Sequence, residues 1–292
     1  MLNIGLSSCG KPLCAELFES YSRAGITHIE ISENKSNTAK LQLNELAEWS
    51  RRFGVTLWSL HLPFMPFAEI DISAPTLSEL SVEYYYGLIK KGTEIGIRNF
   101  IVHPSGEPIA DEERKERMAY AKSGLKKLAE LSLPLGATVC VENLPRTCLG
   151  RDSSDMLELL SAHPALRSCF DTNHLLGEDP AEYIKKVGSR IVTLHVSDYD
   201  FLNERHWLPG EGQTDFAAIL SALSDFDYCG PWLYELGFDT PTTVSRSRDL
   251  TCEDFVRNAN ELFLGKALTV IGTPKPGLTS WKKKQILDKT DK

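Results

Sequence analysis

The sequence lacks the features that would place the chain in a membrane or in an oxidising compartment. It has no run of 18 or more apolar residues, which argues against a transmembrane helix. The N-terminus has neither a basic flank nor a long apolar segment, so it does not resemble a signal peptide. The seven cysteines are odd in number and form no CxxC pair, which favours reduced thiols. These absences predict a cytoplasmic protein with no membrane partner.

Two signals of anion binding are also missing. Residues 7–12, which follow the first strand-like run, contain no GxGxxG or GKS/GKT phosphate loop. This argues against a doubly wound nucleotide-binding domain, the alternative fold for such a pattern. The net charge of −8 argues against a general binder of nucleic acid. Residues 266–292 do carry seven Lys and two Asp, but Pro and Gly interrupt them, so we interpret them as a solvated basic tail.

What the sequence does have is a repeated strand–helix pattern. Short runs rich in Ile, Val and Leu alternate with segments of helical periodicity, several of which end at Gly. The expected strands are 3–7, 27–32, 55–61, 99–103, 138–142, 166–171, 191–196 and 231–235. The expected helices are 12–25, 41–53, 76–95, 111–131, 153–162, 180–187, 215–223 and 252–264. This pattern predicts a single-domain (β/α)8 TIM barrel over residues 1–265, followed by the tail.

Acids and imidazoles stand at or near the ends of seven of these expected strands. They are Glu30, His61, His103, Glu142, Asp171, His195 and Glu235. In a parallel barrel the carboxyl ends of all strands face one side, where active sites lie. We predict that four of these residues hold one divalent metal ion, because three carboxylates and an imidazole suit Mn²⁺, Mg²⁺ or Zn²⁺. These four are Glu142, Asp171, His195 and Glu235.

Further candidates lie in the expected loops. His174 follows Asp171 by three residues, so both can face one ion. Glu204 and His206 alternate and would point to one side of an extended segment. The sequence leaves open whether a set of five residues binds additional metal or substrate. That set is His61, His103, His174, Glu204 and His206. Three more residues are candidates for binding substrate: Glu30, which would hydrogen-bond substrate or orient a metal ligand, and Phe64 and Trp207, which would form walls of the pocket.

The motifs around these residues resemble those of the xylose-isomerase-like TIM-barrel superfamily. They are LHLPF at 60–64, VHPSG at 102–106, VEN at 141–143, FDTNH at 170–174, LHVSD at 194–198, His206 with PGEG at 209–212, and YE at 234–235. The superfamily includes sugar and sugar-phosphate isomerases and epimerases, inosose dehydratases and barrel-type abasic-site DNA endonucleases. The resemblance covers residues 1–265 and implies a metal-dependent enzyme.

The branches of this superfamily imply different metal counts. Resemblance to the ketose epimerases implies one Mn²⁺, Mg²⁺ or Co²⁺ on the quartet named above. Resemblance to the endonucleases implies three zinc ions on a wider set, in which an Asp of the family stands where this chain has Glu204. That set matches His61, His103, Glu142, Asp171, His174, His195, His206 and Glu235. The loop at 33–37 has one basic residue, so a DNA-inserting loop is not evident.

These observations favour an isomerase or epimerase of a small sugar or sugar phosphate that uses one divalent ion, with up to three allowed. Glu142 and Glu235 are expected to be catalytic, because one can take a proton from a carbon beside a carbonyl and the other return it. A multi-zinc phosphodiesterase, an inosose-dehydratase-like lyase and a non-enzymatic binding protein are the alternatives. The pattern allows a homo-oligomer without indicating one.

Overall fold

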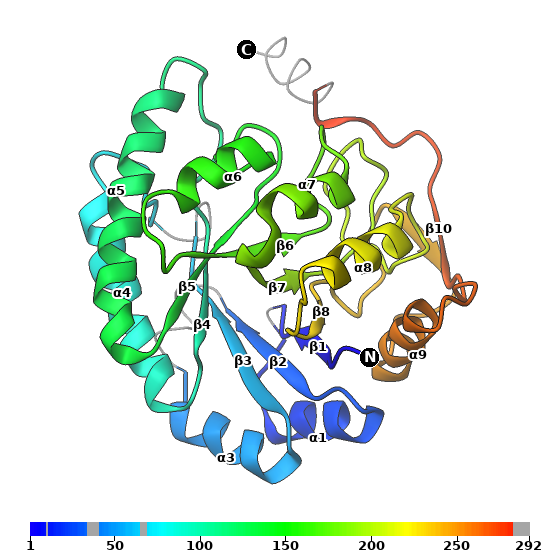
Figure 1. Ribbon diagram of the computed structural model, residues 1–292. Helices are drawn as coiled ribbons and strands as arrows, with labels where there is room; N and C mark the ends of the chain where they lie inside the picture. Colours follow the sequence, from blue (N-terminus) through cyan, green and yellow to red (C-terminus); the bar gives the residue numbers. More distant parts are fainter. Residues whose placement is uncertain (10, 34–40, 65–68, 283–292) are drawn as a thin grey trace.

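The computed structural model describes residues 1–9, 11–33, 41–64 and 69–282. Its centre is a sheet of eight parallel strands, as Figure 1 shows. The strands are β1 (Ile4–Ser7), β2 (His28–Ser32), β3 (Thr56–His61), β4 (Asn99–Val102), β5 (Thr138–Glu142), β6 (Arg167–Asp171), β7 (Ile191–His195) and β8 (Trp232–Tyr234). Their order is β7-β6-β5-β4-β3-β2-β1-β8, so strands that follow one another in the sequence are neighbours. Backbone bonds of Val196 to Leu233 and Glu235 close the ring.

Helices surround this ring on its outside (Figure 1). They are α1 (Ala15–Ala24), α3 (Leu43–Phe53), α4 (Ser78–Glu94), α5 (Arg114–Ser132), α6 (Ser153–Leu160), α7 (Pro180–Val187), α8 (Phe216–Asp225) and α9 (Cys252–Phe263). Their limits follow local chemistry. Asp152, Asp179 and Asp215 accept hydrogen bonds from the first turns of α6, α7 and α8. Gly25 ends α1 with a φ of 94°, which glycine adopts without strain.

The core lies between the strands and the helices, and the apolar side chains of the strands are almost all buried. Close packing restricts the size of the side chains where helices contact strands. In α4, a Cβ on Gly92 would lie 2.6 Å from the ring of Phe100 in β4, so glycine allows this helix to approach its strand. The predicted (β/α)8 barrel is confirmed. Most element limits differ from the prediction by up to three residues, because N-terminal turns begin later than the propensities suggest.

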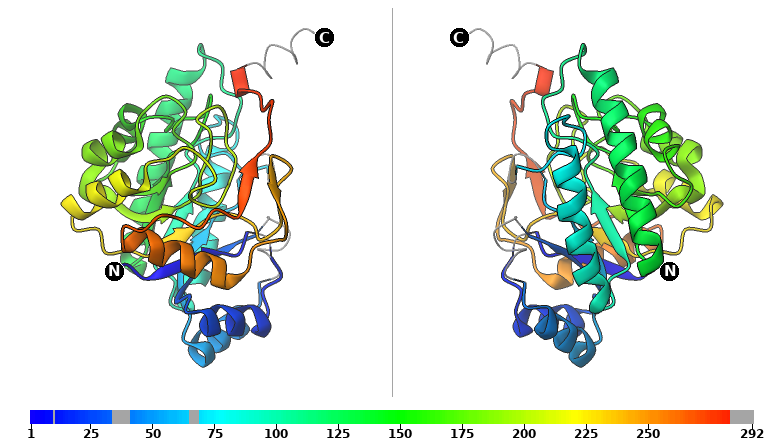
Figure 2. Two further views of the ribbon diagram at one scale, coloured as in Figure 1. Left: turned by 90° about the vertical axis from the view of Figure 1, so that its right-hand side faces the viewer. Right: turned by 90° about the vertical axis from the view of Figure 1, so that its left-hand side faces the viewer.

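Two short strands were not predicted. Strands β9 (Val244–Arg246) and β10 (Gly272–Pro274) pair antiparallel and join the end of the chain to the segment after β8. Figure 2 shows the C-terminal segment, orange to red, running along one side of the molecule. Residues 266–282, interpreted from the sequence as a solvated tail, therefore fold back onto the barrel in part. The expected loop at 33–37 lies outside the described residues except for Glu33.

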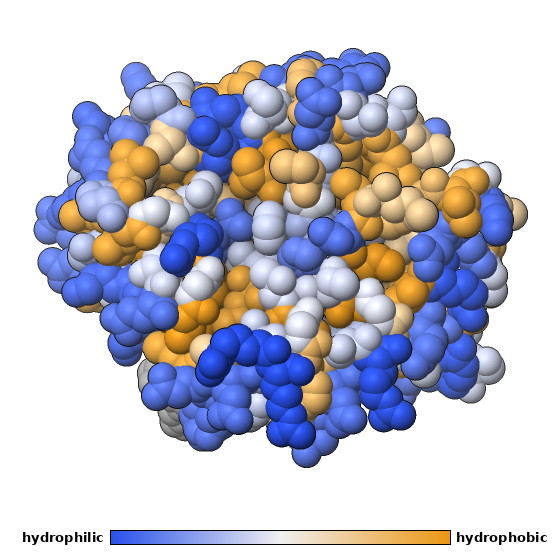
Figure 3. All heavy atoms as spheres, turned by 60° about the horizontal axis from the view of Figure 1, so that its bottom comes forward, coloured by the Kyte–Doolittle hydropathy of each residue, from blue (hydrophilic) through white to orange (hydrophobic). Residues whose placement is uncertain are grey.

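No helix in the described part of the chain is long and apolar enough to span a bilayer. On the face shown in Figure 3, apolar side chains gather in separate patches that hydrophilic side chains interrupt.

Candidate metal centre at the strand ends

A cavity of about 600 Å³ opens at the carboxyl ends of the strands. Its lining includes residues that follow seven of the eight strands, together with the last residue of β2. Those with polar or aromatic groups of interest are His61, Phe64, His103, Glu142, Arg146, His174, Glu204, His206 and Glu235. The topology thus brings nearly all of the predicted site residues to one place, as parallel strands do.

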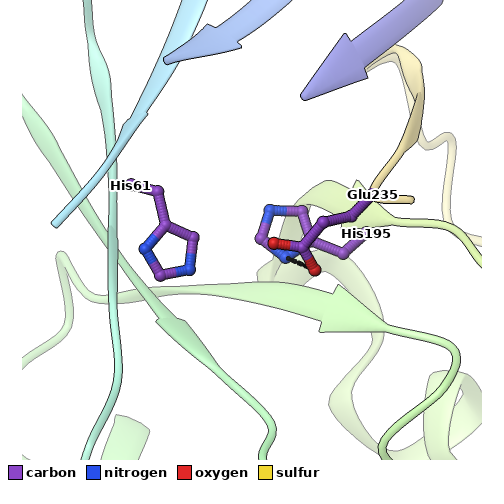
Figure 4. A group of neighbouring side chains, drawn as sticks. All are labelled: His61, His195 and Glu235. Atoms are coloured by element: carbon purple, nitrogen blue, oxygen red, sulfur yellow. Dashed lines mark ion pairs between the residues drawn. The ribbon is translucent and has the colours of Figure 1, made fainter. Parts of the chain in front are cut away.

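Of the predicted quartet, Glu142 and Glu235 line this cavity, and the buried Asp171 and His195 lie against them. Each of its four side chains offers one ligand atom, and these atoms lie within 4.8 Å of one another. His195 Nδ1 lies 3.1 Å from Glu142 Oε1 and 3.2 Å from Glu235 Oε2. Figure 4 shows His195 and Glu235 directed toward each other, with His61 beside them. We define these residues, Glu142, Asp171, His195 and Glu235, as the floor group.

Asp171 supplies a test of whether the floor group fits a metal ion. Its Oδ1 accepts a hydrogen bond from the backbone of Asn173, but its buried Oδ2 has no hydrogen-bond partner. Burial, followed by the negative charges of Glu235 and Glu142, raises the pKa of Asp171 to about 7 in spite of nearby His174. The nearest cationic group to this oxygen is His174 Nδ1, at 3.4 Å. A buried carboxylate oxygen without a hydrogen bond is costly, and a divalent cation would satisfy it. The donor set therefore fits such an ion.

Glu30 lies behind the floor group and not in the cavity lining. Its carboxylate accepts a hydrogen bond from Ser59 Oγ at 2.7 Å and lies 3.0 Å from His195 Nε2. In this contact His195 Nε2 carries a proton and donates it in a hydrogen bond to Glu30. His195 Nδ1 then faces Glu142 and Glu235. Of the two roles expected for Glu30, this contact favours the orientation of His195.

Glu142 connects the floor group to a second set of donors. His61 Nε2 and His103 Nε2 each lie 3.1 Å from Glu142 Oε2, whereas His195 faces Oε1. Burial would raise the pKa of Glu142, but the charges of His195 and His103 hold it well below its usual range. One carboxylate with an oxygen directed at each donor set is the arrangement of a bridging ligand.

A third set of donors, which we call the rim group, consists of His174, Glu204 and His206. Glu204 Oε1 lies 2.9 Å from His206 Nε2 and 3.5 Å from His174 Nε2. The Nδ1 atoms of the two histidines face the backbone carbonyls of Asn143 and Glu235. A carbonyl oxygen can only accept a hydrogen bond, so Nδ1 of each ring carries a proton. In the neutral imidazole, Nε2 therefore has the lone pair that can bind a metal ion.

Protonation of the rim histidines reflects the negative charge around them. Burial by itself lowers the pKa of both imidazoles. The charge of Asp171 and the hydrogen bond to Glu204 outweigh burial at His174 and raise its pKa to about 10. The hydrogen bond to Glu204 raises the pKa of His206 to about 9. A site that attracts protons this strongly also attracts divalent cations at higher pH.

The two aromatic residues predicted as pocket walls lie in different surroundings. Phe64 lines the cavity and stacks on His103, with ring centroids 3.8 Å apart. Trp207 is wholly buried and its Nε1 donates to Thr243 Oγ1, so it does not reach the cavity. The backbone of Trp207 forms a short antiparallel bridge with Asp198.

Arg146 is a cavity residue that the sequence analysis did not identify. Its guanidinium pairs with Glu107 and Glu204, and its Nη1 donates to Glu204 Oε2 at 2.7 Å. Arg146 adopts a φ of 56°, which is uncommon for a residue with a Cβ. Its position four residues after Glu142, in the loop after β5, was the available signal.

Comparison with known proteins places the fold. A family model described as xylose isomerase-like TIM barrel matches residues 18–252. A protein of Mycobacterium leprae, described as uncharacterized, is 22% identical over 284 residues, which are 87% of this chain and 95% of that protein.

Solved structures match over most of the chain. A D-tagatose 3-epimerase-like protein has a TM-score of 0.71 at 24% identity and covers 80% of this chain and 90% of its own. A D-psicose 3-epimerase from Clostridium cellulolyticum H10, solved with D-tagatose, has a TM-score of 0.70 at 20% identity, over 82% and 87%. At these identities the likeness establishes the barrel fold alone.

Proposed function

The chain belongs to the xylose isomerase-like TIM barrel family, and from that premise we propose that it is a divalent-metal-dependent isomerase or epimerase of a small sugar or sugar phosphate. The floor group, at the bottom of a cavity of about 600 Å³, is the observation that carries this proposal. Cavities of roughly 300–1,000 Å³ are typical of small-molecule sites. The likeness to structures described as D-tagatose and D-psicose 3-epimerases supports a sugar as the substrate.

Glu142, Asp171, His195 and Glu235 would hold the metal ion. Mn²⁺, Mg²⁺ and Zn²⁺ are all compatible with three carboxylates and one imidazole. When bound, such an ion supplies positive charge for the oxygens of an enediolate. Glu30 would keep His195 Nδ1 directed at the ion, since its contact with Nε2 fixes the ring.

Two carboxylates are placed to move the proton. Glu142 ends β5 and Glu235 follows β8, so they reach the cavity from different parts of the ring. Burial raises the pKa of Glu235, but the charge of His195 and its hydrogen bond outweigh this and lower the pKa to about 2. Because the pKa of Glu142 is lowered as well, both groups are ionised at neutral pH. One would take the proton from the carbon beside the carbonyl, and the other, after taking up a proton from solvent, would donate that proton to the enediolate carbon.

A second candidate is a multi-zinc phosphodiesterase. The specific observation in its favour is that three donor sets lie around one cavity, with Glu142 between two of them. Such a centre could activate a water molecule and hold a phosphodiester. The net charge of −8 weighs against a nucleic acid substrate.

Solvent isotope exchange tests the first candidate. The purified chain, loaded with Mn²⁺, is incubated in D₂O with a panel of ketoses and ketose phosphates, and the products are followed by NMR. We expect deuterium at the carbon beside the carbonyl, together with an epimer or isomer, and loss of both after chelation. Absence of exchange with the whole panel, combined with cleavage of abasic duplex DNA by protein holding three zinc ions, would establish the second candidate instead.

A further inference from the structure

A second cavity, of about 290 Å³, adjoins the metal cavity. It is lined by Arg146, Arg151, Asp152, His174, Trp281 and Lys282, with Leu176 and Gly177. Arg146 and His174 line both cavities, so the two spaces are neighbours. A substrate whose reacting carbons lie over the floor group can therefore extend into the second cavity.

The charges around this cavity are unbalanced. Arg146, Arg151 and Lys282 carry positive charge, whereas Asp152 is the lone carboxylate among the lining residues given above. Arg146 is already paired with Glu107 and Glu204. Arg151, in contrast, has just one ion pair among the described residues, a loose contact of its Nε with Asp152 Oδ2 at 3.9 Å. The Oδ1 of Asp152 accepts from Asp155 at the start of α6.

Arg151 and Lys282 are thus the cations whose N–H groups have few other contacts in this cavity. Arg151 is 42% exposed, and Lys282 is exposed with its Nζ 5.7 Å from the centroid of the Trp281 ring. Together they offer two positive charges from segments far apart in the sequence. One comes from the loop before α6 and the other from the C-terminal segment. An arginine beside a lysine is a common arrangement around a phosphate.

The C-terminal segment is held in place at this cavity. Trp281 N donates to Leu202 O at 3.1 Å, and Arg205 Nη2 donates to Thr279 O at 3.1 Å. Arg205 is in turn paired with Asp200. These contacts attach Trp281 and Lys282 to the loop that carries Glu204 of the rim group. The second cavity is therefore tied to the metal cavity through one loop.

We propose that the second cavity binds the phosphate group of a phosphorylated sugar whose reacting carbons lie at the floor group. This inference rests on the proposed function and narrows its substrate class from sugars in general to sugar phosphates. A phosphate monoester carries up to two negative charges, which Arg151 and Lys282 match. Trp281 and Leu176 give the cavity an apolar wall for the carbons that join the phosphate to the reacting end.

Phosphate binding to the metal-loaded enzyme tests this directly. Inorganic phosphate is titrated by calorimetry into the wild type, into Arg151→Gln/Lys282→Gln, and into the control Arg23→Gln/Lys266→Gln, which removes two exposed charges elsewhere. We expect the Kd for phosphate to rise at least about tenfold in the first variant, because charge-assisted hydrogen bonds are lost. The control should bind as the wild type does.

An unchanged Kd in Arg151→Gln/Lys282→Gln would mean that metal ions alone hold phosphate, and would overturn the proposal. Lack of phosphate binding by the wild type would overturn it too. For whichever ketose shows isotope exchange, KM of its phosphate ester should rise more in this variant than KM of the unphosphorylated sugar does.

The readouts separate the two proposals. Exchange into an unphosphorylated ketose with no variant-sensitive phosphate binding would leave the proposed function standing and the phosphate site refuted. Phosphate binding that the variant weakens, without exchange into any sugar, would support the phosphate site and refute the proposed function. Displacement of phosphate by abasic duplex DNA, but not by sugar phosphates, would contradict the sugar phosphate assignment.

Discussion

The floor and the rim of the metal cavity are built from different kinds of structure. In the floor group, Glu142, Asp171 and His195 end neighbouring strands and are at most 1% exposed. The registers Glu142–Cys169 and Asp171–His195 fix their relative heights through backbone hydrogen bonds. In the rim group, Glu204 and His206 lie in a loop and are 26% and 35% exposed.

This difference separates what the barrel supplies from what its loops add. Three residues of the floor group are placed by strand pairing, and Glu235 directly follows β8 with its N–H donating to Val196 O. The rim group depends on contacts outside the barrel: Arg146 holds Glu204, and the C-terminal segment holds the loop through Arg205. We infer that the floor provides the metal chemistry and that the rim selects among substrates and reactions.

The largest effect is expected from the floor. Glu142→Gln removes a ligand and a proton acceptor, so kcat for the exchange reaction should fall by at least about 10³-fold. Metal content of the purified variant should fall as well. Glu158→Gln, which changes an exposed carboxylate on α6, is the matched control and should behave as the wild type. Retention of wild-type activity and metal by the first variant would refute the role of the floor group.

A smaller effect is expected from the rim. Glu204→Gln leaves the floor group intact, so the variant should keep one tightly bound ion and lose no more than about tenfold in kcat. Metal analysis and steady-state rates check this. A loss as large as that of Glu142→Gln would mean that floor and rim act as one multinuclear centre, which favours the phosphodiesterase.

The two groups should also differ in the pH dependence of stability. In the metal-free protein, the pKa values of His174 and His206 are raised to about 10 and about 9. Groups with a raised pKa stabilise the fold fully below the unfolded value near 6.5, and this contribution is lost as pH rises through the folded pKa. The Tm of chelated protein should therefore fall between pH 7 and 10. His206→Asn should flatten this dependence; an unchanged slope would contradict the rim assignment.

The smallest effect is expected away from both groups. Trp207→Phe removes the hydrogen bond to Thr243, so unfolding should become easier by about 1 kcal/mol, measured by denaturant titration. KM should not change, because Trp207 does not line the cavity. An increase in KM without loss of stability would indicate that Trp207 contacts the substrate.

The sequence predicted the floor well and the surroundings less well, for physical reasons. Alternation and strand length determine where β5, β6 and β7 end, so the residues there could be identified from the pattern. The sequence pattern did not separate the two roles expected of Glu30, because the register shift between Ile29 and Glu30 is not visible in it. Strand β2 ends at Ser32, as expected, and Glu30 lies two residues before its end, beside Ser59 and His195.

The loops obey no such period. His206 has a φ of 53°, so the alternation of an extended segment does not apply to the side chains around it. The pairing of β9 with β10 joins residues far apart in the sequence, each in a three-residue strand with no apolar run. Arg146 acquires its place in the cavity from Glu107 and Glu204, which lie on two other loops. Long-range contacts of this kind leave no periodic signal.

The most direct test of the account is anomalous diffraction from crystals grown with Mn²⁺ or Zn²⁺, recorded at the metal edge. We predict a peak among Glu142, Asp171, His195 and Glu235, at roughly 2.0–2.3 Å from their ligand atoms. A peak at the rim group alone, or no peak at the floor in crystals of metal-loaded protein, would contradict it.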